Sequence, residues 1–305
     1  MRWACRYRES GPASSCAIKA GLLCALLAGP VSAAPCVTDD AGREVCLEAP
    51  AERIVALSPG IVELLFAVGA GDRVVGAVSH TDYPEAARDI PRVGSSERLD
   101  METLLTREPD LVIAWETGNP GEQVEQLERM GLPVYYSEQE SFDDVASTLQ
   151  RFGRLAGKED KGRQAAVEFL EGLDALERRH GHAEEVRVFY QVWQQPLMTI
   201  GRDHLITETI RLCGGRNVFD DLEALVPRLD LESVLERDPE VVFSGGEGQD
   251  EQAWQARWQR LDSLSAVEQG NLFSLPSSLI ARHTPRLVEG ARLLCEHLED
   301  VRERR

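Results

Sequence analysis

The sequence predicts an α/β fold in which two parallel-sheet lobes are joined by a single long helix. The first observation behind this prediction is an internal repeat: residues 100–113 match residues 230–243, and six of the fourteen positions are identical. Each copy has an Asp suited to a helix N-cap, a short helix, a Pro that cannot continue it, and a buried apolar strand. Two copies of one αβ unit predict two similar lobes, and paired lobes commonly hold a small ligand in the cleft between them.

The second observation is that strands alternate with short helices along the first lobe. Residues 53–57 predict a strand, and residues 61–68 predict a helix that ends at Gly69. A Ser58-Pro59-Gly60 turn separates the two, and a second strand follows at 74–78. This alternation is typical of a parallel sheet built from βαβ units.

The third observation is a long amphipathic helix between the two copies of the repeat. Residues 142–179 are strongly helical with one break at 157–160, and apolar residues recur at helical spacing in 161–179. A helix in this place predicts a stiff crossing between the lobes. The second lobe then begins with a strand at 186–192 and ends with a helix at 285–301. The predicted divisions are a signal peptide at 1–33, an N-terminal ligand-binding lobe at 34–141, connecting helices at 142–184 and a C-terminal ligand-binding lobe at 185–305.

The first 33 residues have the three parts of a targeting segment. Residues 20–29 are apolar, and residues 31–33 form the small-residue cleavage pattern. The basic start consists of Arg2, Arg6, Arg8 and Lys19. The apolar run is too short for a membrane span, which needs about 20 residues. A lipid anchor would need a Cys directly after it, where Gly29 and Pro30 stand. We therefore expect an exported, soluble mature chain that begins near Ala34.

The mature chain is strongly acidic. Without residues 1–33, 29 basic residues against 51 acidic ones give a net charge of −22. Such a surface repels nucleic acid and anionic lipid, so we expect no nucleic-acid partner. It is compatible with a positively charged partner.

Four cysteines follow the targeting segment: Cys36, Cys46, Cys213 and Cys295. An even number of cysteines in an exported chain favours disulfides. Cys36 and Cys46 flank a segment whose Asp-Asp-Ala-Gly centre predicts a hairpin turn, so we pair them across it. That leaves Cys213 with Cys295. The alternative, a metal site, lacks the Cys-x-x-Cys spacing typical of such sites.

Binding residues are expected in the loops at the strand ends that face the cleft, because these loops are free of packing duty. The candidates are Ser58-Pro59-Gly60, His80-Thr81-Asp82-Tyr83 and Trp115 in the first lobe, and Trp193, Gln194, Gln195, Pro196, Met198, Arg282 and His283 in the second. Aromatic side chains that face each other across a cleft suit a large, flat, partly apolar ligand. The alternative for any one Trp or Tyr is simple packing. After the strand at 241–243, the glycine-rich segment 244–248 predicts a mobile loop.

The histidines predict no metal site of the protein's own. His180 and His182 end a charged helix and are expected to be solvated. His80 and His283 fall in the predicted cleft loops, and coordination of a metal by either of them stays open as an alternative.

The sequence contains no catalytic signature. It has no Gly-x-Ser-x-Gly elbow, no Gly-x-x-x-x-Gly-Lys-Ser/Thr loop and no His-Glu-x-x-His pair. We therefore expect a binding protein without catalytic residues, not an enzyme. The more distant alternative is a chelatase-like metal enzyme, since such enzymes also use paired αβ lobes.

Several motifs resemble those of a known family. They are Leu57-Ser58-Pro59 with Glu63-Leu64, Ser79 with Asp82-Tyr83-Pro84, residues 109–115, Gly118-Asn119, and residues 213–219. On these motifs the chain resembles the periplasmic cobalamin-binding proteins of bacterial ABC importers, over nearly all of its length after residue 33. Each motif alone is shared with the wider group that binds iron-siderophores, haem and cobalamin. Three features narrow the resemblance to the members of this group that bind cobalamin. They are Ala114-Trp115, Gly118-Asn119, and the cysteine pair Cys213 and Cys295.

The resemblance implies a helical-backbone substrate-binding protein of the periplasm that captures cobalamin between its lobes and delivers it to an ABC importer. Cobalamin is then a transported ligand, and no cofactor is implied. The implied ligand contacts are Pro59, His80, Tyr83, Trp115 and Arg282.

The resemblance also implies that Glu102 and Glu232 meet arginines on a permease dimer in the inner membrane. The alternative for each Glu is a first-turn carboxylate favoured by the helix dipole, worth at most about 1 kcal/mol. We expect the binding protein itself to be a monomer.

Four positions depart from the family's pattern. His80 stands where a ligand-contacting Tyr is expected, Ser96 and Val226 where Trp residues are expected, and Ser278 where an Asp is expected. Trp193 is a candidate replacement for the missing aromatic wall, and we include it among the ligand contacts. Haem or a ferric siderophore is the alternative ligand, for which His80 or Tyr83 would serve as an iron ligand or an anchor.

Overall fold

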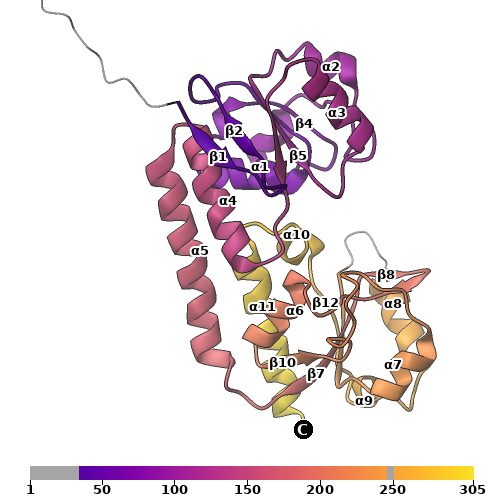
Figure 1. Ribbon diagram of the computed structural model, residues 1–305. Helices are drawn as coiled ribbons and strands as arrows, with labels where there is room; N and C mark the ends of the chain where they lie inside the picture. Colours follow the sequence, from indigo (N-terminus) through magenta and orange to yellow (C-terminus); the bar gives the residue numbers. More distant parts are fainter. Residues whose placement is uncertain (1–33, 246–250) are drawn as a thin grey trace, which may run out of the picture. The chain divides into compact units, whose positions relative to one another are not determined.

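The computed structural model describes residues 34–245 and 251–305 (Figure 1). The signal peptide predicted at 1–33 and residues 246–248 of the predicted mobile loop lie outside this description. In the described part, no helix combines the length and the apolar character needed to cross a membrane. The two four-stranded sheets are both parallel, which confirms the predicted α/β class with parallel-sheet lobes.

A disulfide-bonded hairpin precedes the first sheet. Strand β1 (Cys36–Thr38) pairs antiparallel with β2 (Glu44–Cys46), and the predicted disulfide joins the directly opposite Cys36 and Cys46. The buried carboxylate of Asp39 holds the turn by accepting hydrogen bonds from the backbone and the guanidinium of Arg43. Gly42 has φ +76°, a conformation that favours glycine.

The first parallel sheet has the strand order β4-β3-β5-β6. Its strands are β3 (Ile54–Ala56), β4 (Val74–Ala77), β5 (Leu111–Trp115) and β6 (Val134–Ser137). Its helices are α1 (Pro59–Ala67), α2 (Met101–Leu105) and α3 (Gly121–Arg129), with the 3-10 turns η1 (Gly71–Arg73) and η2 (Glu85–Asp89). Ser58 caps α1 by accepting the N–H of Ile61 at 3.2 Å, and Pro59 fits the first helical turn. The helix therefore begins directly behind β3.

The second parallel sheet has the strand order β10-β7-β11-β12. Its strands are β7 (Val186–Gln191), β10 (Gly215–Asn217), β11 (Val241–Ser244) and β12 (Leu272–Ser274), and a small hairpin is formed by β8 (Trp193–Gln194) and β9 (Leu197–Met198). Its helices are α6 (Leu205–Leu212), α7 (Leu231–Arg237), α8 (Glu251–Trp258), α9 (Ser265–Glu268), α10 (Ser277–Ile280) and α11 (Leu287–Glu303). In both sheets the first strand in the sequence lies between the second and the third. The two sheets therefore share one topology, as the internal repeat predicts.

The two copies of the repeat also agree in backbone detail. Asp100 caps α2 and Asp230 caps α7, and each side chain accepts the N–H three residues later, at 3.0 and 2.8 Å. Glu108 and Asp238, which follow the two helices, both have positive φ, +47° and +40°. The strands that come next, β5 and β11, occupy the same place in their sheets.

An arginine in or directly before the first strand of each sheet holds this turn. Arg53 donates to the carbonyl oxygen of Glu108 and Arg187 to that of Asp238, each at 3.0 Å. The acidic residue two positions later accepts the backbone N–H of the same arginine, again at 3.0 Å in both copies. The repeat is thus a packing unit of helix, turn and two strands.

Two helices lie between the sheets in the sequence, α4 (Phe142–Leu155) and α5 (Glu159–His180), and they break where the sequence predicts. They lie side by side (Figure 1) and come close at Gly153, where an added Cβ would lie 2.9 Å from Gly162 Cα. α5 contacts α1 of the first half and both α6 and α11 of the second. The long helix is therefore shared by the two halves, as predicted.

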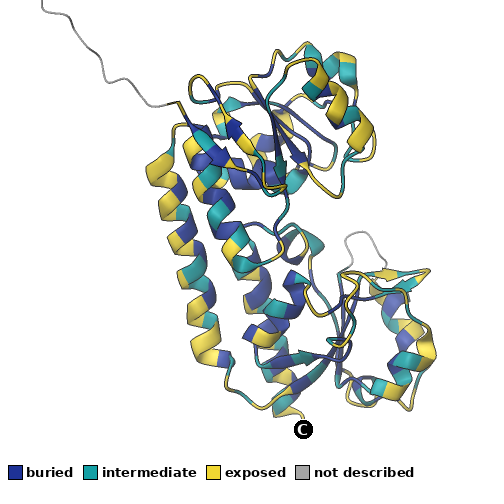
Figure 2. Cartoon of the chain, viewed as in Figure 1, coloured by how far each residue is buried: buried dark blue, intermediate teal, exposed yellow. Residues whose placement is uncertain are grey.

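The apolar core follows the same plan. The strands of both sheets are largely buried, and the helices present exposed faces outward (Figure 2). The largest apolar cluster includes Ile54 of β3, Phe169 of α5 and Leu294 of α11. One core thus continues from the first half through α5 to the C-terminal helix.

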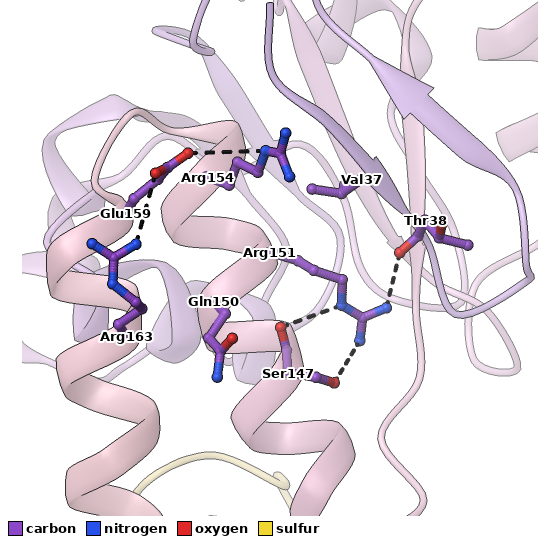
Figure 3. Close-up of a pocket in the computed structure, with 8 residues that line it drawn as sticks. All are labelled: Val37, Thr38, Ser147, Gln150, Arg151, Arg154, Glu159 and Arg163. Atoms are coloured by element: carbon purple, nitrogen blue, oxygen red, sulfur yellow. Dashed lines mark hydrogen bonds and ion pairs between the residues drawn. The ribbon is translucent and has the colours of Figure 1, made fainter. Parts of the chain in front are cut away.

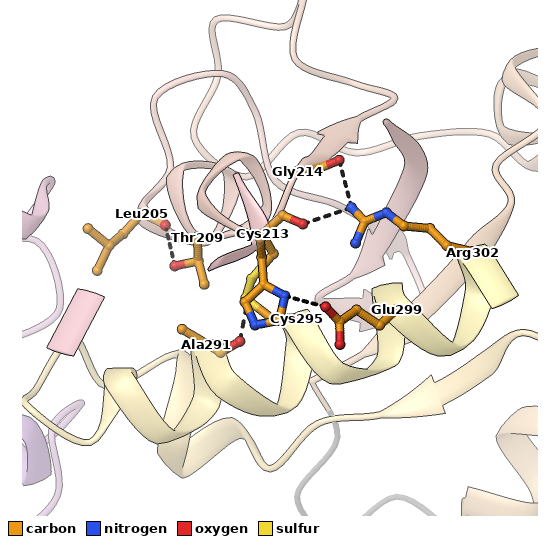
Figure 4. Close-up of a disulfide and its surroundings, with 9 residues drawn as sticks. Leu205, Thr209, Cys213, Gly214, Ala291, Cys295, Glu299 and Arg302 are labelled. Carbon is orange, nitrogen blue, oxygen red and sulfur yellow. Dashed lines mark hydrogen bonds and ion pairs between the residues drawn. A yellow bond between two sulfur atoms is a disulfide. The ribbon is translucent and has the colours of Figure 1, made fainter. Parts of the chain in front are cut away.

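The second predicted disulfide, between Cys213 and Cys295, joins the end of α6 to α11 (Figure 4). On the same helix, Arg302 donates to the carbonyl oxygen atoms of Cys213 and Gly214 at 2.9 and 3.1 Å. Covalent and polar contacts therefore hold α11 against the start of β10.

The prediction that His180 is solvated is wrong. Its side chain is 3% exposed, and Nδ1 lies 2.8 Å from Oε1 of Glu299 on α11. The end of α5 packs against α11, which the amphipathic pattern of α5 alone does not reveal. The neighbouring His182 is exposed, as expected.

Candidate ligand-binding site

A cavity of about 250 Å³ lies where strands of both sheets end. Trp115 is the last residue of β5, Tyr190 and Val192 lie at the end of β7, and Gly245 follows β11. In open α/β sheets, the carboxyl ends of the strands at the point where the strand order reverses are the usual place for a ligand. The other lining residues are Thr117, Glu138, Gln139, Glu140, Asp203, His204, Leu205, Ile206, Leu225, Val226, Ala281 and His283.

Trp115 is held by its neighbours in the sequence and by β6. Its backbone N–H donates to Asn119 Oδ1 at 2.6 Å, and its indole Nε1 donates to Glu138 at 3.2 Å. Asn119 in turn donates to the carbonyl oxygen of Leu57, at the end of β3. An added Cβ on Gly118 would lie 1.9 Å from Cε3 of the indole, so the ring needs glycine there. The Gly118-Asn119 motif therefore fixes the position of the tryptophan.

The carboxylates around the cavity have no basic counterpart there. Glu138, Glu140 and Asp203 line it, whereas no Lys or Arg occurs among its described lining residues. Glu138 is further fixed by the backbone N–H and the hydroxyl of Thr117, at 3.1 and 2.7 Å. Burial, and then the charge of Glu138, raise the pKa of nearby Glu116. The cavity therefore disfavours anions and suits neutral or cationic groups.

Two histidines form part of the cavity wall. The rings of His204 and His283 meet edge to face with their centroids 5.8 Å apart. Nδ1 of His204 accepts the N–H of Ile206 at 3.1 Å, whereas Nδ1 of His283 lies 2.8 Å from the carbonyl oxygen of Gln139. Burial lowers the pKa of both rings, and the charge of His283 helps to lower that of His204 to about 4. Both rings are therefore neutral at pH 7.

A second polar cluster is centred on Glu63, which is buried in α1. Its carboxylate accepts hydrogen bonds from Arg282 at 2.8 Å, Thr284 at 2.9 Å and Arg286 at 3.3 Å. Arg282 also donates to Asp82 at 2.7 Å. Burial acts to lower the pKa of Arg282, but the hydrogen bonds to Asp82 and Glu63 raise it above its usual value. The cluster joins the segment before α11 to helix α1, which packs with the first sheet.

Most predicted ligand contacts lie beside this Glu63 cluster. The carbonyl oxygen of His80 lies 3.5 Å from the guanidinium of Arg282, and Arg286 stacks 3.9 Å above the ring of Tyr83. Pro59 opens α1 next to Gly60, where an added Cβ would lie 2.7 Å from the carbonyl oxygen of Arg282. These residues gather around one point of contact between the halves of the chain, but they do not line the cavity.

The remaining predicted residues lie elsewhere. Trp115 and His283 line the cavity, as described, whereas Trp193 stands on β8, 56% exposed, with its Nε1 bonded to the carbonyl oxygen of Gln195. Glu102 and Glu232 are exposed in the first turns of α2 and α7 and do not line the cavity.

Sequence reasoning missed most of the cavity wall. His204 was not predicted because His is not a usual N-cap residue, although it directly precedes the apolar start of α6. Gln139 and Glu138 follow β6, a strand for which no end loop was singled out. Val226 was recognised only as a departure from a family pattern, and it does line the cavity.

A larger cavity, of about 540 Å³, lies between the first hairpin and helices α4 and α5 (Figure 3). Its arginines are already paired: Arg151 with Asp40 at 2.7 Å, and Arg154 and Arg163 with Glu159 at 3.9 and 3.8 Å. It does not lie at the strand ends of either parallel sheet. The smaller cavity is therefore the better candidate site.

Comparison with known proteins agrees with this fold. The family model for periplasmic binding proteins matches residues 54–279. The vitamin B12-binding protein of Vibrio parahaemolyticus is 34% identical over 256 residues, which cover 84% of this chain and 92% of that protein. The vitamin B12-binding protein of Yersinia pestis is 32% identical over 256 residues, covering 82% and 88%.

Solved structures give the same result. The crystal structure of the periplasmic vitamin B12 binding protein BtuF of Vibrio cholerae superposes with a TM-score of 0.73 at 32% identity, covering 83% of this chain and 98% of that one. The periplasmic haem-binding protein HutB of Vibrio cholerae also has a TM-score of 0.73, but its 20% identity shows the shared fold alone. The family match, the identity to these relatives and the paired parallel sheets lead to one conclusion: this chain belongs to the periplasmic binding protein family.

Proposed function

We propose that this protein captures cobalamin in the periplasm and delivers it to an ABC importer. The observation that carries the proposal is the 32–34% identity, over more than four fifths of the chain, to relatives named for vitamin B12 binding. Periplasmic binding proteins bind and hand over ligands and are not enzymes. Cobalamin is accordingly cargo and not a cofactor.

The chemistry of the cavity supports a corrinoid over the alternatives. A corrinoid ring carries neutral amide side chains, which can donate hydrogen bonds to Glu138 and Gln139. Haem carries two carboxylates, and these would meet Glu138, Glu140 and Asp203 without a Lys or Arg among the described lining residues. Haem or a ferric siderophore therefore remains the second candidate, favoured only by the shared fold.

The ligand must reach beyond the cavity, because about 250 Å³ is less than the usual volume of roughly 300–1,000 Å³ for small-molecule sites. We infer that it rests on Trp115 and extends along the surface of both halves. Its contacts in this proposal are Pro59, His80, Tyr83, Trp115, Trp193 and Arg282. The lobes would then be residues 34–141 and 185–305, with residues 142–184 connecting them.

For delivery, we propose that a monomer docks on a permease dimer through Glu102 and Glu232. Both side chains are exposed, and each stands second in the first turn of a matching helix. Residues 1–33 would act as the signal peptide that brings the chain to the periplasm, since they combine a basic start, an apolar core and a small-residue cleavage pattern.

Calorimetric titration of the purified protein with cyanocobalamin, haem and a ferric siderophore in turn tests the ligand. We expect one cyanocobalamin per protein with submicromolar affinity and much weaker binding of the other two. Submicromolar haem binding without cyanocobalamin binding would overturn the assignment.

A further inference from the structure

We propose that Nε2 of His283 is an axial ligand to the cobalt of the bound corrinoid, taking the place of an exchangeable water. The inference rests on the proposed function and adds a residue role to it. Four observations support it: the proton position on the ring, the backbone that presents the ring, the open Nε2, and the different state of the neighbouring His204.

The hydrogen bond to Gln139 fixes the proton position. A carbonyl oxygen can only accept, so the 2.8 Å contact requires the proton to be on Nδ1 of His283. In the neutral ring the lone pair is then on Nε2. A histidine that binds a metal through one nitrogen commonly donates its other N–H to a carbonyl or carboxylate, which orients the ring and makes the ligand more basic.

The residues on both sides of His283 are fixed by hydrogen bonds, and they hold its backbone in place. Arg282 and Thr284, the two neighbours of His283, both donate to the carboxylate of Glu63 in α1, at 2.8 and 2.9 Å. Between them His283 has φ +48°, a strained conformation for a non-glycine residue that tends to occur at functional sites. The ring of His204 packs edge-on against it. A ligating nitrogen needs this kind of support from its surroundings.

Nε2 of His283 is available to a ligand. Among the described residues none forms a hydrogen bond with this atom. The side chain of His283 lines the same cavity as Trp115.

The neighbouring His204 cannot play the same part. Its Nδ1 accepts the N–H of Ile206, so the neutral ring carries its proton on Nε2. It would have to lose that proton before binding a metal through the free nitrogen. His80 is exposed and does not line the cavity. Of these three histidines, only His283 offers a free lone pair to the site.

The ligation step is a simple exchange. In aquacobalamin the bond between cobalt and water breaks and the water leaves, while Nε2 donates its lone pair to form the new bond. Cobalt remains Co(III), and no proton is transferred because Nε2 is already unprotonated. In cyanocobalamin the tightly held cyanide occupies this position. The contribution of His283 should therefore appear with aquacobalamin and be missing with cyanocobalamin.

Absorption spectra and titrations with these two corrinoids test the proposal. The variant is His283→Asn, because Asn tolerates a positive φ better than most residues. The matched control is His182→Asn, which changes an exposed histidine outside the cavity. Wild-type protein and the control should shift the aquacobalamin spectrum to that of aquacobalamin mixed with free imidazole. His283→Asn should abolish the shift, and it should weaken aquacobalamin binding at least tenfold more than it weakens cyanocobalamin binding.

Retained cyanocobalamin binding also shows that the variant is folded. Binding of aquacobalamin to the wild-type protein without a spectral shift would overturn the ligation, and this test needs no variant. A shift that persists in His283→Asn would overturn it as well. If the wild-type protein binds neither corrinoid, the proposed function fails too, and this outcome is distinct from binding without ligation.

Discussion

At the scale of single residues, Glu63 illustrates how one side chain can hold distant segments together. It lies in α1, yet its three partners, Arg282, Thr284 and Arg286, are more than 200 positions away. The side chain is only 2% exposed. A buried carboxylate is tolerated because each of its neighbours donates to it. Replacing Glu63 should therefore lower the free energy of unfolding substantially.

Glu63→Gln should lower the free energy of unfolding by about 3 kcal/mol, because Arg282 and Arg286 lose a buried countercharge. Asp82 still neutralises Arg282 in part, which keeps the loss at the lower end for a buried pair. Urea denaturation measures it. The matched control is Glu296→Gln, which breaks the half-exposed pair with Arg292 and should cost less than about 1 kcal/mol. Equal losses in the two variants would contradict this account.

Trp115 is an exposed aromatic residue of the cavity, with 39% of its surface accessible. Trp115→Ala should weaken cyanocobalamin binding by about 1 to 3 kcal/mol through lost apolar contact. Isothermal calorimetry gives the difference. Trp193→Ala provides a comparison with an exposed tryptophan that does not line the cavity. Unchanged affinity in Trp115→Ala would remove this cavity as the binding site, whereas a loss in Trp193→Ala would show how far the ligand extends.

At the scale of elements, the sequence predicts well what depends on neighbours in the chain. The N-caps Asp100 and Asp230, the hairpin between Cys36 and Cys46, and the helix break after Leu155 all follow from local residue types. Contacts between distant elements do not follow in this way. The burial of His180 against α11 is one example: its neighbours in the sequence are charged, and only the packing of two helices removes it from water.

The cavity shows the same limit more strongly. It combines residues after β5, β6, β7 and β11 with the start of α6. A sequence pattern can indicate that such loops meet, as it did for Trp115, but not which side chains turn inward. The contact that Gln139 makes in the cavity is one example: its carbonyl oxygen meets Nδ1 of His283, which lies 144 residues further along the chain.

The N-cap residue of helix α6, His204, makes the free energy of unfolding depend on pH. The pKa of His204 is about 4 in the folded protein, against about 6.5 for an exposed histidine. Above pH 6.5 both states are neutral. As the pH falls from 6.5 towards 4, the unfolded chain takes up a proton that the folded protein does not, so stability is lost. This amounts to about 2 kcal/mol between pH 7.5 and pH 5.

His204→Asn should remove this loss while keeping a side-chain acceptor for the N–H of Ile206. Urea unfolding at the two pH values measures it: the variant should lose about 2 kcal/mol less than the wild-type protein. Parallel losses in both proteins would mean that His204 is not held neutral by its surroundings.

The two disulfides differ in the length of chain that they close. Cys36 and Cys46 are 10 positions apart, and Cys213 and Cys295 are 82 positions apart. In the chain-entropy account, the longer loop restricts the unfolded state more, by roughly 2 kcal/mol. Replacing both cysteines of the second pair by Ala should therefore cost more unfolding free energy than the same change in the first pair. Denaturation of the two double variants decides it, and the reverse order would contradict the entropic explanation.

At the scale of the whole molecule, the repeat places one exposed glutamate in each half. Glu102 and Glu232 follow N-cap residues at matching positions, and the helices that carry them precede the third strands of two sheets with one topology. Two equivalent carboxylates suit a partner made of two identical subunits. The strongly acidic chain after residue 33 adds a long-range attraction towards a basic surface.

Reversing both charges, Glu102→Arg with Glu232→Arg, should prevent complex formation with the permease and stop cobalamin uptake, because loss of one partner of a desolvated charge pair can cost about 2 to 5 kcal/mol. Cobalamin affinity in solution should not change, since neither side chain lines the cavity. The matched control is Glu122→Arg with Glu289→Arg, which reverses one exposed first-turn glutamate in each half, on α3 and α11. This control changes the net charge equally, so it separates a specific contact from general attraction. Normal uptake in the Glu102 and Glu232 variant, or an equal loss of uptake in the control, would contradict docking through these two residues.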